Sequence, residues 1–235
     1  MARAYDAVIF DLDGTLVDSA PSVRKVLNQF LGEIGLLPFD LAGTRGMIGL
    51  GVGHLLRSAL AARGVAPDDA RFVQYLTRFM ELYEAAPAGD NAAIAGAEDA
   101  LRGLRASGIR IGLCTNKPEG PTRNVIAARG WAGLFSAIVT GDSLPQKKPD
   151  PAPLIFAWSR LGTDLTRTLY VGDSEIDAQT ASAAGIDFAL RLGGYVLDPD
   201  QHIDGICSFY DYATLVDFVR RGARTSLARA GAWPD

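Results

Sequence analysis

Four segments of the chain place polar side chains at, or just after, the ends of apolar runs. Together they contribute the side chains that could do chemistry: Asp11, Asp13, Thr115, Asn116, Lys148, Asp173 and Asp177. Three of the runs predict buried strands, and the carboxyl ends of strands in an open parallel sheet share one crevice. Four carboxylates, a threonine and a lysine could therefore meet in one place, where they could hold a divalent cation and a phosphoryl group.

Asp11 stands at the end of the first predicted strand, residues 6–11. A carboxylate in that position can attack phosphorus and form an aspartyl-phosphate. Asp13, two residues on, can protonate the leaving alkoxide and later take a proton from the attacking water. Asp-x-Asp-Gly could also be only a turn, because Asp and Gly favour turns. The buried strand before it and the stretch 15–19 after it favour the catalytic interpretation.

Asp173 and Asp177 follow a later strand, and they face the same way if a helix begins there. One can bind a metal directly while the other orients it, either directly or through water. Hard oxygen ligands predict Mg²⁺, with Asp11 and the backbone carbonyl of Asp13 completing the protein ligands. Four aspartates and a phosphate dianion would carry about −6 against +1 from Lys148, so a divalent ion is needed to keep them ionised.

Thr115 and Asn116 end the second of these strands, where a hydroxyl and adjacent N–H groups can bind a phosphoryl oxygen. An Asn-Lys-Pro turn that caps the next helix is the alternative. Lys148 offers a compact charge for the transition state, although most lysines are merely solvated. Its neighbour Lys147 is an equal candidate on residue type alone.

The composition predicts a globular protein without a nucleic-acid or membrane partner. The 235 residues are 48% hydrophobic and 21% charged, and the net charge of −4 argues against a basic face for nucleic acid. No apolar run approaches the ~18 residues of a membrane span, and the first residues lack a signal-peptide core. Cys114 and Cys207 form no disulfide pattern, so we expect a cytoplasmic protein.

The order of predicted elements indicates an α/β fold with an insertion. After the first strand, residues 20–86 show only helical periods, and from about residue 90 helices and strands alternate. The predicted helices are 97–107, 119–129, 151–161, 175–184 and 211–221, and the predicted strands are 109–114, 136–140, 168–172, 187–191 and, weakly, 205–209. Such alternation predicts a parallel sheet. We expect a core of 1–16 and 90–222, an all-α cap of 17–89 and a tail of 223–235.

These motifs, in this order and spacing, resemble the haloacid dehalogenase-like hydrolase superfamily over about residues 5–220. Its phosphatase branch, and the phosphoglycolate phosphatases within it, looks most similar. The resemblance implies a Rossmann-like three-layer core with strand order 5-4-1-2-3 and a helical cap after the first strand. It also implies that Thr115 contacts the phosphoryl group and that Lys148, next to proline, is the family's lysine. Asp13 favours phosphatases over dehalogenases, because an alkoxide needs a proton on leaving and a halide does not.

The expected function is a Mg²⁺-dependent phosphatase acting on a small phosphorylated metabolite, with 2-phosphoglycolate as the expected substrate. We expect a monomer or a homodimer. Arg45, at the start of a glycine-rich stretch, could bind a substrate carboxylate, although a surface arginine in a helix connector is the alternative. Gly194 and Tyr195 match a pair that is usual in the phosphatases that the chain resembles.

Three other functions remain open from the sequence. A phosphosugar mutase would use the same core but protect the aspartyl-phosphate from water. A phosphonatase would need a Schiff-base lysine in the cap, where Lys25 is the only lysine. A signalling receiver domain also combines an acidic cluster with Thr and Lys, but it is about half this length and lacks a helical insert after its first strand.

Overall fold

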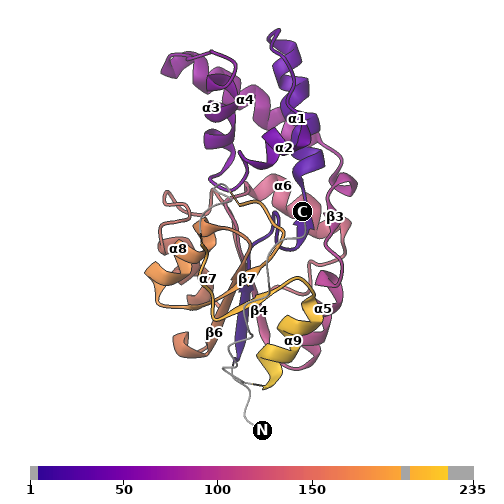
Figure 1. Ribbon diagram of the computed structural model, residues 1–235, viewed down its shortest axis with the longest axis vertical. Helices are drawn as coiled ribbons and strands as arrows, with labels where there is room; N and C mark the ends of the chain where they lie inside the picture. Colours follow the sequence, from indigo (N-terminus) through magenta and orange to yellow (C-terminus); the bar gives the residue numbers. More distant parts are fainter. Residues whose placement is uncertain (1–4, 197–201, 222–235) are drawn as a thin grey trace.

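The computed structural model describes residues 5–196 and 202–221 (Figure 1). Within them, six parallel strands form one sheet in the order β5-β4-β1-β6-β7-β8. Their bounds are Ala7–Phe10 (β1), Arg110–Cys114 (β4), Ala137–Val139 (β5), Thr168–Gly172 (β6), Asp187–Arg191 (β7) and Cys207–Phe209 (β8). The predicted order of the five core strands is confirmed, and β8 extends the sheet beyond β7. The predicted tail, 223–235, lies outside the described residues.

Helices cover both faces of the sheet. One face packs on α5 (Ala97–Ala106), α6 (Glu119–Ala128) and α9 (Tyr212–Arg221), and the other on α7 (Ala152–Ser159) and α8 (Glu175–Ala184). Strand β1 shows why both layers form: Val8 and Phe10 belong to the first apolar core, whereas Ala7 and Ile9 belong to the second. Because successive side chains of a strand point to opposite faces, a continuously apolar strand is buried on both. The three-layer α/β core is therefore confirmed.

Four helices between β1 and β4 form a separate layer beyond the carboxyl ends of the strands (Figure 1). They are α1 (Ala20–Glu33), α2 (Leu41–Arg45), α3 (Val52–Ala61) and α4 (Asp69–Ala85). Leu27, Phe30, Leu56 and Phe79 are fully buried in an apolar core of their own. Asp68 caps the start of α4 by accepting a hydrogen bond from the backbone N–H of Arg71.

Two strands that the sequence did not predict connect this helical cap to the core. Strands β2 (Val17–Asp18) and β3 (Ala92–Ala93) pair antiparallel where the chain leaves and rejoins the sheet. Two-residue strands are too short to show a periodicity, which is why the pattern gave no indication of them. The 3₁₀ turns η1 (Ala88–Asp90) and η2 (Leu165–Arg167) complete the elements of the described chain.

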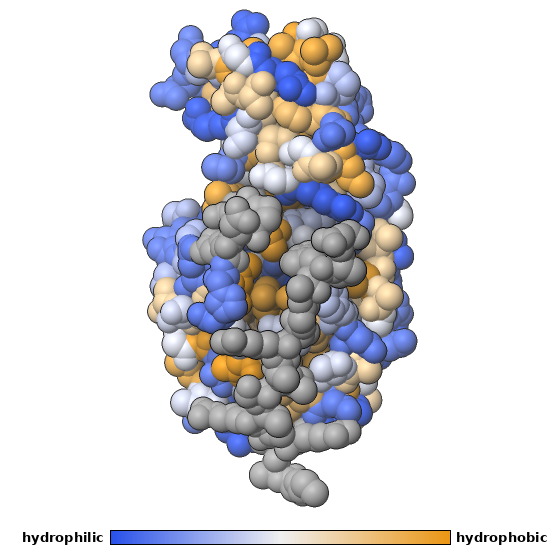
Figure 2. Space-filling model, viewed as in Figure 1, coloured by the Kyte–Doolittle hydropathy of each residue, from blue (hydrophilic) through white to orange (hydrophobic). Residues whose placement is uncertain are grey.

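On the face seen in Figure 2, hydrophilic and apolar residues are mixed over both the cap and the core. None of the helices in residues 5–196 and 202–221 combines the length and the apolar character that crossing a bilayer requires.

Candidate active site

Asp11 and Asp173 come together because β1 and β6 are neighbours in the sheet. Phe10 pairs with Val171, so the two aspartates leave adjacent strand ends. Oxygen atoms of Asp11, Asp173 and Asp177 all lie within 4.8 Å of one another, and all three side chains are buried. Gly14 makes this approach possible: its φ is +82°, and a Cβ there would lie 2.3 Å from Asp173 Oδ2. In the structure these three carboxylates lie together, as the sequence predicts.

The negative charges of the carboxylates in this cluster repel one another. Burial, reinforced by the charges of Asp177 and Asp13, raises the pKa of Asp11 from 3.8 to about 7 even though Lys148 opposes the shift. Burial, followed by the charges of Asp177 and Asp11, also raises the pKa of Asp173 well above its usual value. Asp11 Oδ1 is buried and forms an ion pair with Lys148 Nζ, 2.8 Å away. Buried, mutually repelling oxygens fit a hard divalent cation.

Asp177 is held differently from the other two carboxylates. Its Oδ1 accepts hydrogen bonds from Lys148 Nζ and Tyr170 OH, both at 2.7 Å, and its Oδ2 accepts one from Ser174 Oγ, also at 2.7 Å. Burial raises the pKa of Asp177. The charge of Lys148 and the hydrogen bonds from Lys148, Ser174 and Tyr170 more than offset this effect, so the pKa is lowered. Asp177 thus stays ionised and fixes the lysine.

Lys148 lies between two carboxylates, with Nζ 2.8 Å from Asp11 Oδ1 and 2.7 Å from Asp177 Oδ1. Lys147 is exposed. The Asn116 side chain holds the Lys148 backbone: its Oδ1 accepts from Lys148 N at 3.0 Å and its Nδ2 donates to Lys148 O at 2.9 Å. The same Nδ2 donates to Gly49 O in the cap, also at 2.9 Å. Asn116 therefore joins two loops, and both Asn116 and Thr115 line the cavity.

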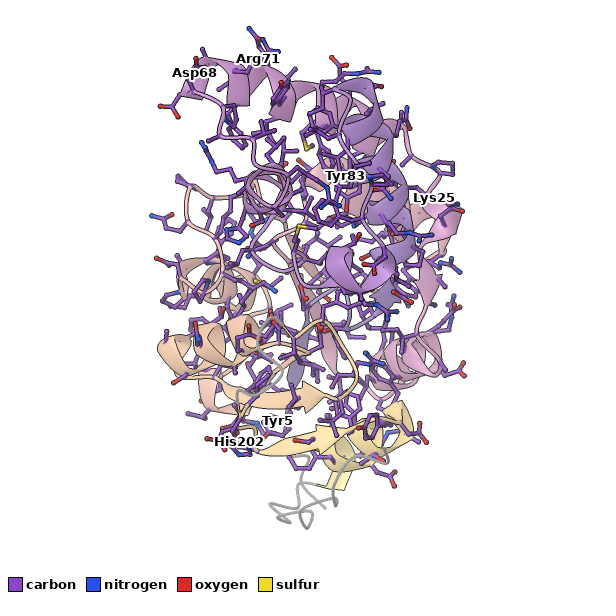
Figure 3. All side chains as sticks on the ribbon, turned by 45° about the horizontal axis from the view of Figure 1, so that its top comes forward. Tyr5, Lys25, Asp68, Arg71, Tyr83 and His202 are labelled. Atoms are coloured by element: carbon purple, nitrogen blue, oxygen red, sulfur yellow. The ribbon has the colours of Figure 1, made fainter. Side chains whose placement is uncertain are left out.

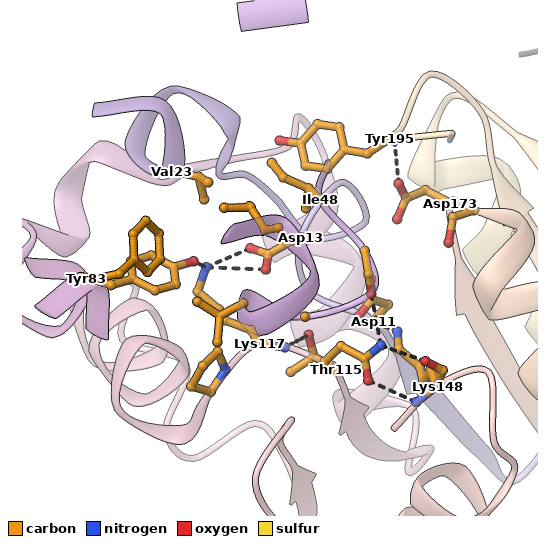
Figure 4. Close-up of a pocket in the computed structure, with 18 residues that line it drawn as sticks. Asp11, Asp13, Val23, Ile48, Tyr83, Thr115, Lys117, Lys148, Asp173 and Tyr195 are labelled. Carbon is orange, nitrogen blue, oxygen red and sulfur yellow. Dashed lines mark hydrogen bonds and ion pairs between the residues drawn. The ribbon is translucent and has the colours of Figure 1, made fainter. Parts of the chain in front are cut away.

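Lys117 and Tyr83 are residues at this site that the sequence reasoning missed. Lys117 Nζ lies 3.0 and 3.3 Å from the two oxygens of Asp13, and it donates to Tyr83 OH at 2.5 Å (Figure 4). The lysine side chain is 1% exposed. Burial opposes its positive charge, but Asp13 and Tyr83 raise the pKa of Lys117 above its usual value. Its place in the loop after Thr115 was an available indication, whereas Tyr83 looked like any apolar-face residue of a helix.

Thr15 and Tyr195 hold Asp173 from two sides. Thr15 Oγ1 donates to Asp173 Oδ1, and the backbone N–H of Tyr195 donates to Oδ2, both at 2.6 Å. The Tyr195 hydroxyl donates to Asp18 and accepts from the backbone N–H of Ala20 at 3.0 Å. Tyr195 thus connects the acidic cluster to the start of the cap, which gives the Gly-Tyr pair noted in the sequence a structural role.

Two cap residues named from the sequence lie away from this cluster. Arg45 is half exposed, with Nη2 3.4 Å from Asp18 and the guanidinium 5.9 Å from the centre of the Tyr195 ring. Lys25 is mostly exposed and lies on the outside of the cap, 2.8 Å from Asp90 (Figure 3). Neither lines the cavity described next.

A cavity lies between the cap and the core, and polar side chains from the strand ends of the core line it (Figure 4). Its core side carries Asp11, Asp13, Asp173, Thr115, Lys117 and Lys148. Its cap side is mainly apolar, and the cap side chains that line it are Val23, Ile48, Val52, Leu55, Phe79 and Tyr83. The arrangement can hold a metal, an attacking carboxylate and a second carboxylate for proton transfer, under an apolar roof that excludes water.

Known proteins match both the sequence and the fold. Residues 5–185 match a family described as haloacid dehalogenase-like hydrolase. A phosphoglycolate phosphatase of Cereibacter sphaeroides is 50% identical over 214 residues, which are 91% of this chain and 97% of that protein. One of Rhodospirillum rubrum is 42% identical over 217 residues, 91% of this chain and 90% of that protein.

Among solved structures, one described as a predicted phosphoglycolate phosphatase from Haemophilus somnus aligns with a TM-score of 0.84. It is 26% identical, and the alignment covers 94% of this chain and all of the other. The resemblance inferred from the motifs is thereby confirmed, and a receiver domain is excluded. The chain belongs to the haloacid dehalogenase-like hydrolases.

Proposed function

We propose that the protein is a Mg²⁺-dependent phosphatase that hydrolyses 2-phosphoglycolate to glycolate and phosphate. The observation that carries the proposal is the buried cluster of Asp11, Asp173 and Asp177 with Lys148, beside the carboxylate of Asp13, which is paired with Lys117. The names of the relatives in Cereibacter and Rhodospirillum support the choice of substrate. A cap that covers the cavity suits a small substrate, which can be enclosed completely.

In the proposed reaction, a carboxylate oxygen of Asp11 attacks phosphorus and the bond to the ester oxygen breaks. Asp13 gives its proton to that oxygen, so glycolate leaves and an aspartyl-phosphate remains. Asp13 then takes a proton from the water that attacks this intermediate, which releases phosphate and regenerates both carboxyl groups. Lys148 and Thr115 bind the phosphoryl oxygens, and Asn116 keeps the Lys148 backbone in place.

Asp11, Asp173 and the backbone carbonyl of Asp13 would hold Mg²⁺, with Asp177 acting through water because its own oxygens already accept several hydrogen bonds. When bound, the ion supplies positive charge that balances the carboxylates and the phosphoryl oxygens. Thr15 and Tyr195 keep Asp173 oriented for that role.

The alternative functions on this fold, phosphonatase and phosphosugar mutase, can be distinguished from a phosphatase by the structure of the cap and by the products formed. The only cap lysine, Lys25, pairs with Asp90 outside the cavity, so a Schiff base there has no structural support. A mutase would convert one sugar phosphate into an isomer, whereas a phosphatase releases inorganic phosphate.

The test is phosphate release from a panel of metabolites with added Mg²⁺, comparing 2-phosphoglycolate with hexose phosphates, together with product analysis. We expect 2-phosphoglycolate to give the highest kcat/KM and phosphate and glycolate to form in equal amounts. The Asp11→Asn variant is expected to remain folded and inactive. Phosphate release by that variant, or an isomeric sugar phosphate as the product, would overturn the proposal.

A further inference from the structure

The cavity contains a cationic group that the proposed chemistry at phosphorus does not use. Among the described residues that line it, Lys117 and Lys148 carry the positive charges. Lys148 is committed to Asp11 and Asp177. Lys117 lies on the other side of the catalytic residues, against Asp13 and Tyr83. The ion pair with Asp13 offsets the cost of burying the Lys117 charge, but Lys117 also lines the cavity, where it can bind an anionic group of a ligand.

Tyr83 offers a hydrogen-bond donor beside that charge. Its hydroxyl accepts a hydrogen bond from Lys117 Nζ, and no described residue accepts one from it. The side chain is only 8% exposed and lines the cavity. A buried hydroxyl normally donates its proton to a partner, so this one is free to donate to a ligand. Most of the other cap side chains around it are apolar and offer no hydrogen bond.

The position of Asp13 fixes which part of a substrate these groups can reach. In the proposed mechanism Asp13 gives its proton to the ester oxygen, and Lys117 Nζ lies 3.0 Å from the Asp13 carboxylate. Substrate atoms one or two bonds beyond the ester oxygen must therefore lie next to Lys117 and Tyr83. In 2-phosphoglycolate the carboxylate carbon is two bonds from that oxygen.

We propose that Lys117 and Tyr83 bind the carboxylate of the substrate and so select phosphate esters that carry a second anionic group close to the ester oxygen. Lys117 supplies the charge, and Tyr83, hydrogen-bonded to it from the cap, donates its hydroxyl proton to the same carboxylate. The inference rests on the proposed function, since it names the substrate group that this cavity recognises. It gives the role expected of Arg45 to residues inside the cavity.

A competing explanation is that Lys117 only positions Asp13. The two roles differ in their dependence on the substrate. A residue that positions Asp13 affects every ester equally, because every leaving oxygen needs the same proton. A residue that binds the carboxylate affects only esters that carry one.

The experiment compares 2-phosphoglycolate with ethyl phosphate, in which a methyl group replaces the carboxylate. The variants are Lys117→Met and Tyr83→Phe, which remove the charge and the hydroxyl with little change in size. Lys147→Met is the matched control, since it removes the same charge from an exposed lysine outside the cavity. The quantity measured is the ratio of kcat/KM for the two substrates.

We expect the preference for 2-phosphoglycolate to fall about 10- to 100-fold in Lys117→Met and about 10-fold in Tyr83→Phe, the size of a lost hydrogen bond to a charged group. Lys147→Met should keep the wild-type ratio. If the ratio is unchanged in both cavity variants while both substrates slow together, Lys117 is a positioning residue and the inference is wrong. Tyr83→Phe decides the question if Lys117→Met does not fold.

A binding measurement separates this inference from the proposed function. In the Asp11→Asn background with Mg²⁺, 2-phosphoglycolate should bind more tightly than ethyl phosphate, and Lys117→Met should remove most of the difference. That result supports the anion site even if the wild-type protein releases no phosphate from 2-phosphoglycolate, in which case only the proposed function fails. Equal binding of the two ligands to Asp11→Asn would overturn the inference whatever the turnover.

Discussion

Replacing Asp11 by Asn should stabilise the metal-free protein while it removes activity. The carboxyl group is buried among other acids, and its pKa is raised from 3.8 to about 7, first by burial and then by Asp177 and Asp13, against the effect of Lys148. Since one pKa unit corresponds to about 1.4 kcal/mol, holding Asp11 ionised in the folded protein costs ~4 kcal/mol. Asn keeps the size of the group without its charge, so it approximates the protonated form.

The sign of the pH dependence follows from the same shift. Between about pH 4 and pH 7 the folded protein holds a proton on Asp11 that the unfolded chain has lost, so the free energy of unfolding decreases as the pH rises. In the wild-type protein this loss is about 2 kcal/mol at about pH 5 and ~4 kcal/mol at about pH 8. The Asp11→Asn variant lacks this ionisable group, so its free energy of unfolding should exceed that of the wild type by these amounts.

The assay is urea unfolding in EDTA at both pH values, with Asp69→Asn as the control. Asp69 is fully exposed, so its replacement should not stabilise the protein. Saturating Mg²⁺ should reduce or reverse the advantage of Asp11→Asn, because the ion balances the charge in the wild type. If Asp11→Asn is no more stable than the wild type in EDTA at about pH 8, the carboxylates do not repel one another as the structure indicates.

Three further outcomes are expected. Complete removal of metal with EDTA should abolish phosphate release, and added Mg²⁺ should restore it; full turnover without any bound metal would contradict the proposed site. In the first turnover, Asp13→Asn should slow ethanol release from ethyl phosphate by about 10²- to 10⁴-fold but slow nitrophenolate release from p-nitrophenyl phosphate much less, because nitrophenolate leaves without a proton, and equal losses in this first step would count against an acid role. Leu56→Ala should lower the free energy of unfolding by about 2–5 kcal/mol in thermal or urea melts, since its side chain is fully buried in the cap core, and a loss under about 1 kcal/mol would show that the cap adds little to global stability.

Most of the acidic cluster was predictable because its residues lie where strands of the sheet end. Asp11 and Asp173 each follow an apolar run that becomes a buried strand, and the family resemblance supplied the strand order that makes these two strands neighbours. The position of Asp177 was predicted from its helical spacing to Asp173. The capping box that Asp177 forms with Ser174 is likewise a local arrangement. These residues lie near elements that a short pattern can identify.

The substrate side of the cavity was not predictable in the same way. Tyr83 lies on the apolar face of α4, and periodicity cannot distinguish a tyrosine that reaches a cavity from one that fills a core. Asn116 was predicted as a phosphate ligand from its position alone, and that position gave no sign that its amide also joins the backbones of Gly49 and Lys148, which are 67 and 32 residues from it in sequence. Arg45 had the right chemistry, but its direction depends on how the cap sits over the core, and the structure turns it toward Asp18.

Some of the polar contacts that join cap and core begin at residues that hold the groups of the proposed site. Asn116 holds the Lys148 backbone and the cap carbonyl of Gly49. Tyr195 holds Asp173 with its backbone N–H and the start of the cap with its hydroxyl. Any displacement of the cap that breaks these contacts therefore also loosens Lys148 and Asp173. Since the near-attack arrangement must be held within a fraction of an ångström, an open cap would leave the catalytic groups less well placed, and closure over a substrate would complete them.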